Sequence, residues 1–132
     1  MSIHTQGIIG EKLGLNVITK LVNPDRIMQA DWLFKVNDQW CASEIKNKKA
    51  FRSNKTDFVG QGLNIKQLES RLAFQKDTGI RCLFVCFEPG SKYVHIQWLD
   101  TLNKTPDKLI FGQSGIVIFN LKHFRTLDRY SL

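Results

Sequence analysis

The residues of this chain that could do chemistry gather around the tripeptide Glu44-Ile45-Lys46. Because side chains alternate along a strand, Glu44 and Lys46 would point to the same face of one. Asp31 opens another apolar segment, residues 30–36, and a tight turn at 37–39 would place Asp31 roughly opposite Glu44. Two carboxylates at short range repel each other unless a cation lies between them. A hard divalent ion with oxygen ligands, Mg²⁺ or Mn²⁺, is the expected occupant.

Lys46 would complete a set of residues suited to phosphodiester hydrolysis. Its ammonium could orient or help deprotonate the attacking water, or stabilise the charge that develops on the phosphoryl group. Glu11 is a candidate third acid and metal ligand. It lies among Ile8, Leu15 and Ile18 on a helix face that we expect to point inward, where a lone carboxylate needs a partner.

Each of these residues also has an ordinary structural interpretation. A Glu-x-Lys strand is often only an exposed ion pair. Asp31 alone could cap the start of a strand, and Glu11 alone could be a solvated helix residue. The combination is more informative: an acid in a first helix, an acid opening a strand, Glu44 and Lys46 on the paired strand, and then a basic segment.

A cluster of positive charge follows these residues directly. Five of the ten residues from 46 to 55 are basic and none is acidic, in a chain whose net charge is +7. We expect those beyond Lys46 to hold the phosphates of a nucleic acid without reading its bases. They are Lys48, Lys49, Arg52 and Lys55. For any one of them alone, a solvated surface position is the simpler interpretation.

The composition indicates one globular domain, residues 1–132, with 42% hydrophobic and 23% charged residues. No apolar run reaches the length of a membrane span, and the first residues lack the features of a signal peptide, so we expect a cytoplasmic protein without membrane contact. Cys41, Cys82 and Cys86 have no metal-binding spacing, and we expect the last two to be reduced core residues.

Helical and strand patterns alternate along the chain and must position these residues. Residues 3–21 predict a helix that breaks at Pro24, residues 30–36 and 40–48 a hairpin, residues 46–62 a long polar loop, and residues 63–76 a helix ending at Thr78-Gly79. Residues 80–87, 93–99 and 115–121 predict strands. The order predicts an α/β domain with a central mixed sheet flanked by helices. Residues 111–121 are a candidate interface strand.

The segments "GIIGEKLG", "QADWLFKV", "SEIKNK" and "NIKQLESRLAFQKDTG", in this order, resemble the PD-(D/E)XK nuclease superfamily. The resemblance runs from Gly7 to about Leu99 and implies a restriction-endonuclease-like core with a metal-dependent nuclease site. Asp31 would match the strand-opening aspartate, although an alanine precedes it where the nominal motif has proline. Glu44 and Lys46 would match the E-x-K pair of the superfamily.

Other positions also take roles from this resemblance. Glu11 would match the helix acid of many members. Gln67, together with Lys66, would match the amide or basic position on the second helix that supports the site, and Lys66 is a further candidate contact to nucleic acid. Pro24-Asp25 looks like the strand-opening motif, but no predicted strand follows it directly.

Within the superfamily, the small Holliday junction resolvases of the RecU and archaeal types are the most similar in spacing and size. The resemblance implies a Mg²⁺-dependent DNA endonuclease selective for branched DNA. Because cutting two strands needs two sites, we expect a homodimer or higher symmetric oligomer. The alternatives are a sequence-specific homing or restriction-type endonuclease, a non-catalytic nucleic-acid-binding module, and a nuclease directed at RNA.

Overall fold

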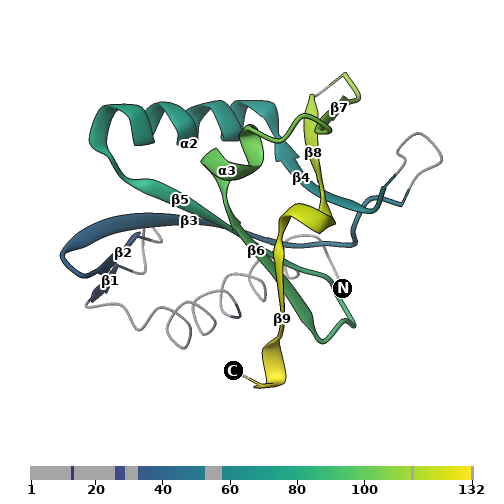
Figure 1. Ribbon diagram of the computed structural model, residues 1–132, viewed down its shortest axis with the longest axis horizontal. Coiled ribbons are helices and arrows are strands. Elements are labelled where there is room, and N and C mark those ends of the chain that lie inside the picture. Colours follow the sequence, from purple (N-terminus) through teal and green to yellow (C-terminus); the bar gives the residue numbers. More distant parts are fainter. Residues whose placement is uncertain (1–12, 14–25, 29–32, 53–57, 114, 132) are drawn as a thin grey trace.

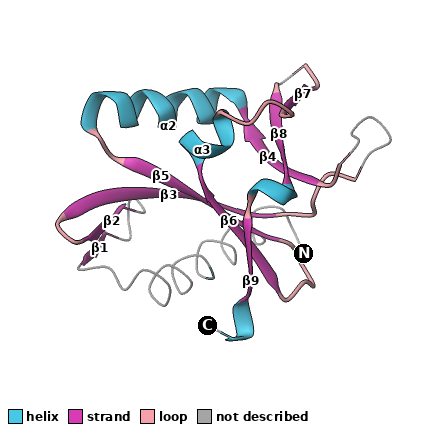
Figure 2. Cartoon of the chain, in the orientation of Figure 1, coloured by secondary structure: helices cyan, strands magenta, loops and turns pink. Residues whose placement is uncertain are grey.

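The computed structural model describes residues 13, 26–28, 33–52, 58–113 and 115–131 (Figure 1). Its strands form two sheets, and helices pack against them (Figure 2). The strands are β1 (Arg26–Met28), β2 (Leu33–Val36), β3 (Gln39–Asn47), β4 (Gly60–Asn64), β5 (Arg81–Phe87), β6 (Tyr93–Trp98), β7 (Leu109–Phe111), β8 (Ile116–Asn120) and β9 (Arg125–Asp128). The helices are α2 (Ile65–Thr78) and α3 (Leu99–Asn103), with 3₁₀ turns at Leu121–His123 and Arg129–Ser131.

The larger sheet is mixed and has the strand order β1-β2-β3-β5-β6-β9 in the described part of the chain. β3 and β5 are parallel, and the other neighbours pair antiparallel. Parallel neighbours need a crossover connection, which here contains β4 and α2. The prediction of an α/β fold around a central mixed sheet is therefore confirmed.

Both faces of this sheet carry apolar side chains. Successive residues of β5 are apolar and point to opposite sides, so each face receives some of them. Cys82, Phe84 and Cys86 belong to the core cluster that contains Leu68 of α2. Leu83, Val85 and Phe87 belong to a second core cluster. Leu13, partly buried and helical, packs against this second cluster. The rest of the helix predicted over residues 3–21 lies outside the described residues.

The hairpin of β2 and β3 turns through Asn37 and Asp38, whose φ angles are +49° and +64°. Asn and Asp tolerate this left-handed backbone better than most residues, and two such residues form the tight turn that suits a twisted hairpin. The turn sets a register in which Leu33 pairs with Ala42. The predicted hairpin is confirmed, with Gln39 already part of β3.

Helix α2 begins and ends with recognisable caps. The side chain of Asn64 accepts a hydrogen bond from the backbone N–H of Lys66 at 2.8 Å. Gly79 follows the last turn with a φ of +75°, a left-handed conformation that glycine adopts easily. The predicted end of this helix is confirmed. Its start is two residues later than expected, because Leu63 and Asn64 belong to β4.

The predicted polar loop over residues 46–62 is wrong at both ends. β3 continues to Asn47, and Gly60, Gln61 and Gly62 lie in β4. A Cβ atom on Gly62 would lie 2.1 Å from the backbone oxygen of Val117. These glycines therefore permit a close approach of two strands, whereas the sequence pattern was interpreted as a loop signal.

Two other predictions need correction. Arg26–Met28 forms β1 and pairs with β2, where only a break after the first helix was expected. A strand therefore does follow Pro24-Asp25 directly in sequence, contrary to the expectation. Within the segment 111–121, predicted as an interface strand, β8 pairs with β4 on one side and with β7 on the other. The central residues of β8 are buried in the protein's own core, so β8 is an interior strand of its sheet, and an interface role for this segment stays a prediction.

Cys82 and Cys86 are buried free thiols, as predicted, and Cys41 is a half-buried free thiol. No helix among the described residues is long and apolar enough to cross a bilayer.

Candidate active site

Strand β3 and helix α2 bring four polar side chains together on one side of the central sheet. Glu44 and Lys46 are two residues apart on β3, and Gln67 and Arg71 are four residues apart on α2. Two residues of a strand rise by about 6.6 Å and four residues of a helix by about 6 Å, so the two pairs match in spacing. Each side chain on β3 therefore meets one on α2.

Consecutive contacts link the four side chains to one another. The Lys46 Nζ lies 3.3 Å from Glu44 Oε1 and donates a hydrogen bond to Gln67 Oε1, also at 3.3 Å. The Arg71 Nε donates to Glu44 Oε2 at 3.2 Å, and Arg71 Nη2 lies 3.1 Å from the same oxygen. Each oxygen of the Glu44 carboxylate therefore contacts one cation.

The cluster lies at the boundary between the core and solvent. The side chains of Glu44, Lys46 and Arg71 are 11%, 24% and 40% exposed, respectively. A carboxylate as buried as Glu44 needs partners for its charge, and these two cations supply them. The more exposed Lys46 and Arg71 remain within reach of a substrate at the surface.

Ionisable groups beside the cluster respond to its charges and to burial. Burial, with a smaller contribution from the negative charge of Glu44, raises the pKa of Cys82 to about 12. Burial also lowers the pKa of Lys48, and the positive charge of Lys46 adds to this effect. The Lys48 ammonium lies 5.2 Å from the centre of the Phe51 ring, which gives it a cation–π contact.

Among the acidic residues predicted for the site, Glu44 is the one that the structure describes. Asp31 and Glu11 lie outside the described residues. The last described pair of this hairpin is Leu33 with Ala42, and the position predicted for Asp31 opposite Glu44 stays a prediction. The prediction that Glu44 and Lys46 share one face is confirmed by their contact.

Arg71 was missed by the sequence analysis. It lies four residues after Gln67, so both occupy the same side of α2. That spacing was the available signal, but an arginine on an amphipathic helix is usually a solvated residue. Its partner, Glu44, is 27 residues away in sequence, and only the packing of α2 on β3 connects the two.

The basic segment after β3 is attached to the sheet through Glu88. The backbone N–H of Ala50 donates to Glu88 Oε1 at 3.1 Å. The Arg52 guanidinium reaches both oxygens of the same carboxylate, with Nη1–Oε1 and Nη2–Oε2 distances of 2.5 and 3.1 Å. Arg52 is thus already paired with an acid, whereas Lys49 is exposed. Lys55 lies outside the described residues.

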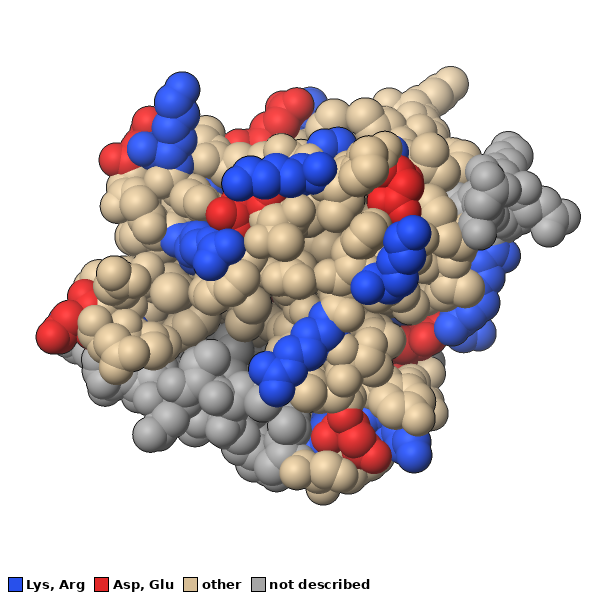
Figure 3. All heavy atoms as spheres, viewed as in Figure 1, with Lys and Arg blue, Asp and Glu red and all other residues tan. Residues whose placement is uncertain are grey.

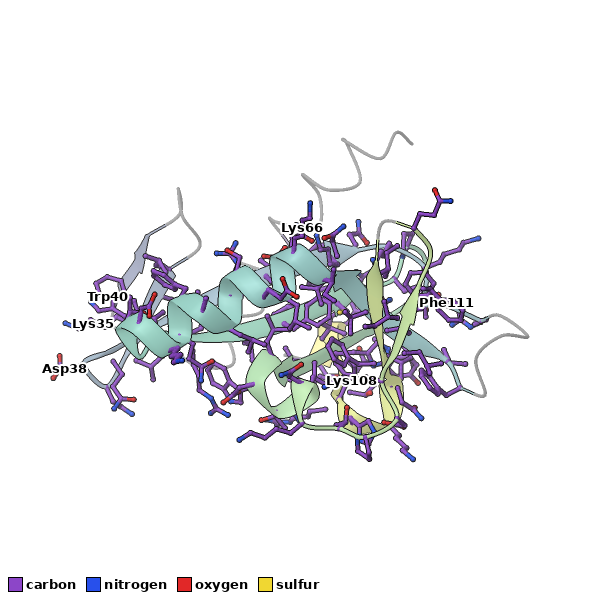
Figure 4. The ribbon with its side chains drawn as sticks, turned by 90° about the horizontal axis from the view of Figure 1, so that it is seen from above. Lys35, Asp38, Trp40, Lys66, Lys108 and Phe111 are labelled. Carbon is purple, nitrogen blue, oxygen red and sulfur yellow. The ribbon has the colours of Figure 1, made fainter. Side chains whose placement is uncertain are left out.

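Lys66 extends from α2 into solvent on the side away from α3 (Figure 4). It directly precedes Gln67, so it places a further positive charge near the cluster. The face of the molecule toward the viewer in Figure 3 differs, because acidic and basic side chains alternate on it. Among the described residues, Arg81 pairs with Asp100, Lys122 with Asp107 and Lys92 with Asp128.

A hard cation such as Mg²⁺ requires oxygen ligands, and Glu44 offers two carboxylate oxygens. The residues that the structure describes contain no group of three or more His, Cys, Asp or Glu side chains that could hold a metal ion. Glu44 therefore suits such an ion in chemistry. A full set of protein ligands would have to include the acids outside the described residues.

The chain has a structural likeness to a known protein but no sequence match to one. No family model and no curated protein sequence matches the chain. Among solved structures, the chain is similar to Archaeoglobus fulgidus Hjc, a Holliday junction resolvase from an archaeal hyperthermophile. The TM-score is 0.49 and the sequence identity 13%, over 83% of this chain and 88% of the Hjc chain.

Proposed function

We propose that the protein is a metal-dependent DNA endonuclease that hydrolyses phosphodiester bonds, with branched DNA as its preferred substrate. The observation that carries this proposal is the contact of Glu44 and Lys46 on β3, supported from α2 by Gln67. A carboxylate for an ion, beside a positioned ammonium at the edge of the core, is the arrangement that phosphodiester hydrolysis requires.

Lys46 has the role of stabilising charge and orienting the attacking water. The Gln67 side-chain carbonyl accepts a hydrogen bond from the Lys46 ammonium at 3.3 Å, which helps to orient the ammonium. With 24% of its side chain exposed, Lys46 can reach a phosphate at the surface. Holding such a group in place before substrate arrives lowers the entropic cost of the reaction.

Glu44 has the role of metal ligand, together with Asp31 and with Glu11 as a supporting acid. Mg²⁺ is the proposed ion, and Mn²⁺ would fit the same oxygen ligands. When bound, such an ion would polarise the phosphoryl group and favour ionisation of the attacking water. The chain's own contribution is to hold the carboxylate in place, which β3 does from within the central sheet.

Basic side chains near the cluster have the role of holding DNA phosphates. Lys49 and Lys66 are exposed. Lys48 directly follows the last residue of β3 and precedes Lys49 in the basic segment. Arg52 reaches the DNA only if it leaves Glu88 or binds a phosphate with the N–H donors that Glu88 does not engage. Cleavage of two strands would require two copies of the chain, so the proposal includes a symmetric homo-oligomer.

The test is cleavage of a synthetic four-way junction and of a linear duplex with matched sequence, each with Mg²⁺ or with a chelator. Lys46→Ala and Glu44→Gln should each lower the cleavage rate by about 100-fold or more, since positioned charged groups contribute factors of this order. Lys76→Ala, on the last turn of α2, is the matched control and should cut normally. Undiminished cleavage by purified Lys46→Ala would refute the assignment.

The two substrates separate the enzymatic alternatives. Symmetric nicking of the junction alone supports a resolvase. Cleavage of the linear duplex at one fixed sequence supports a homing or restriction-type enzyme. The same panel with an RNA duplex tests whether the substrate is RNA.

One observation favours a different class of function. Both oxygens of Glu44 already contact cations of the protein, Lys46 and Arg71, as expected in a nucleic-acid-binding module that uses no metal. Such a module would bind DNA equally well with and without Mg²⁺ and would cut no substrate in the panel.

A further inference from the structure

Arg71 holds the carboxylate that the proposed function assigns to a metal ion. Its Nε and Nη2 atoms lie 3.2 and 3.1 Å from Glu44 Oε2, so two donors of one guanidinium converge on one oxygen. The other oxygen, Oε1, is 3.3 Å from the Lys46 ammonium. An ion that binds Glu44 must therefore approach a carboxylate that two positive groups already neutralise.

A divalent ion and the guanidinium cannot share Glu44 without strong repulsion. A metal on either oxygen would lie within a few ångströms of Arg71, and the repulsion is proportional to the product of the two charges. The side chain of Glu44 is only 11% exposed, so little water is present to screen it. One of the two cations must move away when an ion binds.

The contacts indicate that Arg71 is the cation that moves. Lys46 has a second partner, Gln67, and its side chain is 24% exposed. Arg71 is 40% exposed, and in the described part of the chain its hydrogen bonds and ion pair go to Glu44 alone. Its long side chain starts from the partly exposed surface of α2, so it can turn into solvent without breaking another contact of its own.

A released guanidinium at this position would face the DNA. Arg71 lies on the same side of α2 as Gln67, one turn further along. Its planar set of donors matches the oxygens of a phosphate as well as those of a carboxylate. After leaving Glu44, the Arg71 guanidinium can therefore bind a backbone phosphate of the substrate.

We infer that Arg71 is a positioning residue that exchanges partners: it holds Glu44 in the metal-free protein and a DNA phosphate once a divalent ion occupies Glu44. This inference rests on the proposed function, because it needs an ion at Glu44. Ion binding and DNA binding would then support each other. The ion frees the guanidinium for the phosphate, and the phosphate keeps the guanidinium away from the ion.

The first experiment measures Mn²⁺ affinity of the full chain without DNA, by calorimetry or by electron paramagnetic resonance. Arg71→Gln removes the competing cation and should bind Mn²⁺ about tenfold more tightly than the wild type. Lys76→Gln removes the same charge from the same helix and should stay within about twofold. Arg71→Lys, which keeps a cation near Glu44, should bind Mn²⁺ less tightly than Arg71→Gln, and circular dichroism checks that each variant is folded.

The second experiment measures DNA affinity as a function of salt, with Ca²⁺ present and with a chelator. With Ca²⁺, Arg71→Gln should lower the slope of log affinity against log salt concentration by about 0.9, the value for one lost phosphate contact. With the chelator, the slope should equal that of the wild type, because Arg71 then contacts Glu44.

The outcomes separate this inference from the proposed function. Equal or weaker Mn²⁺ binding by Arg71→Gln would overturn the exchange, and loss of Mg²⁺-dependent cleavage in Lys46→Ala would still support the nuclease. If Glu44→Gln binds Mn²⁺ as tightly as the wild type, Glu44 is no metal ligand, and the proposed site and the exchange both fail. A slope change that is the same with and without Ca²⁺ would also overturn the exchange.

Discussion

The ion pair of Glu44 and Arg71 should contribute measurably to the stability of the metal-free protein. Two guanidinium nitrogens lie 3.1 and 3.2 Å from one carboxylate oxygen. Hydrogen bonds to charged groups contribute about 1.5–3 kcal/mol when buried, whereas exposed ion pairs contribute about 0–1 kcal/mol. Glu44 is 11% exposed and Arg71 40% exposed, which places the pair between these limits. We therefore expect a coupling free energy of about 1–2 kcal/mol.

A double-mutant cycle measures this coupling. The variants are Glu44→Gln, Arg71→Gln and the double substitution, unfolded with urea at neutral pH in the presence of a chelator, with tryptophan fluorescence as the signal. Glu44→Gln alone should be destabilising, because it leaves the Lys46 and Arg71 charges close together without an anion between them. In the double variant, part of that loss should be recovered.

The exposed pair of Lys35 and Asp38 serves as the control cycle. Its N–O distance is 3.5 Å, but the Asp38 side chain is 95% exposed, so water and salt screen the interaction. Its two substitutions should be additive within the error of the measurement. If the Glu44–Arg71 cycle is additive within about 0.5 kcal/mol, the limit seen for independent sites, the two side chains do not interact and the described site geometry is refuted.

Three further predictions concern the scaffold. Gly62→Ala should lower the free energy of unfolding by more than about 3 kcal/mol, because its Cβ would lie 2.1 Å from the Val117 oxygen; a loss below 1 kcal/mol in denaturant titrations would contradict this close approach. Glu88 accepts hydrogen bonds from Arg52, which lower its pKa below the ordinary value. Its stabilising effect is therefore present above about pH 4.3 and lost as the pH falls through the lowered pKa. The difference in free energy of unfolding between the wild type and Glu88→Gln should shrink on acidification. A difference that stays constant with pH would argue against the pairing. The thiol of Cys82, with a pKa raised to about 12, should react with iodoacetamide at neutral pH only after unfolding, as peptide mass spectrometry can show; rapid labelling of the native protein would contradict its burial.

Much of the fold follows from local patterns in the sequence. The apolar run around Phe84 becomes β5, buried on both faces, because only an interior strand can bury every side chain in succession. The left-handed turn at Asn37 and Asp38 and the glycine after α2 have residue types that favour those backbone conformations.

Other segments could not be predicted in this way. Gly60 and Gly62 indicated a loop, but they form the part of β4 where another strand approaches too closely for a side chain. β1 is three residues long and depends on its pairing with β2. β8 has the composition of a strand, but whether it is central or at an edge depends on which strands pair beside it.

The sequence by itself determined that Glu44 and Lys46 share one face, because alternation along a strand is a local property of the backbone. It also indicated that Gln67 belongs to a helix that follows them. Only the tertiary structure decided that Arg71 neutralises Glu44 and that Glu88 engages Arg52. These pairs join residues that are distant in the chain, and their formation depends on how α2 packs on β3 and where β5 ends. Side-chain direction within one strand is set by local geometry, whereas the partner of a charge is set by the packing of the whole domain.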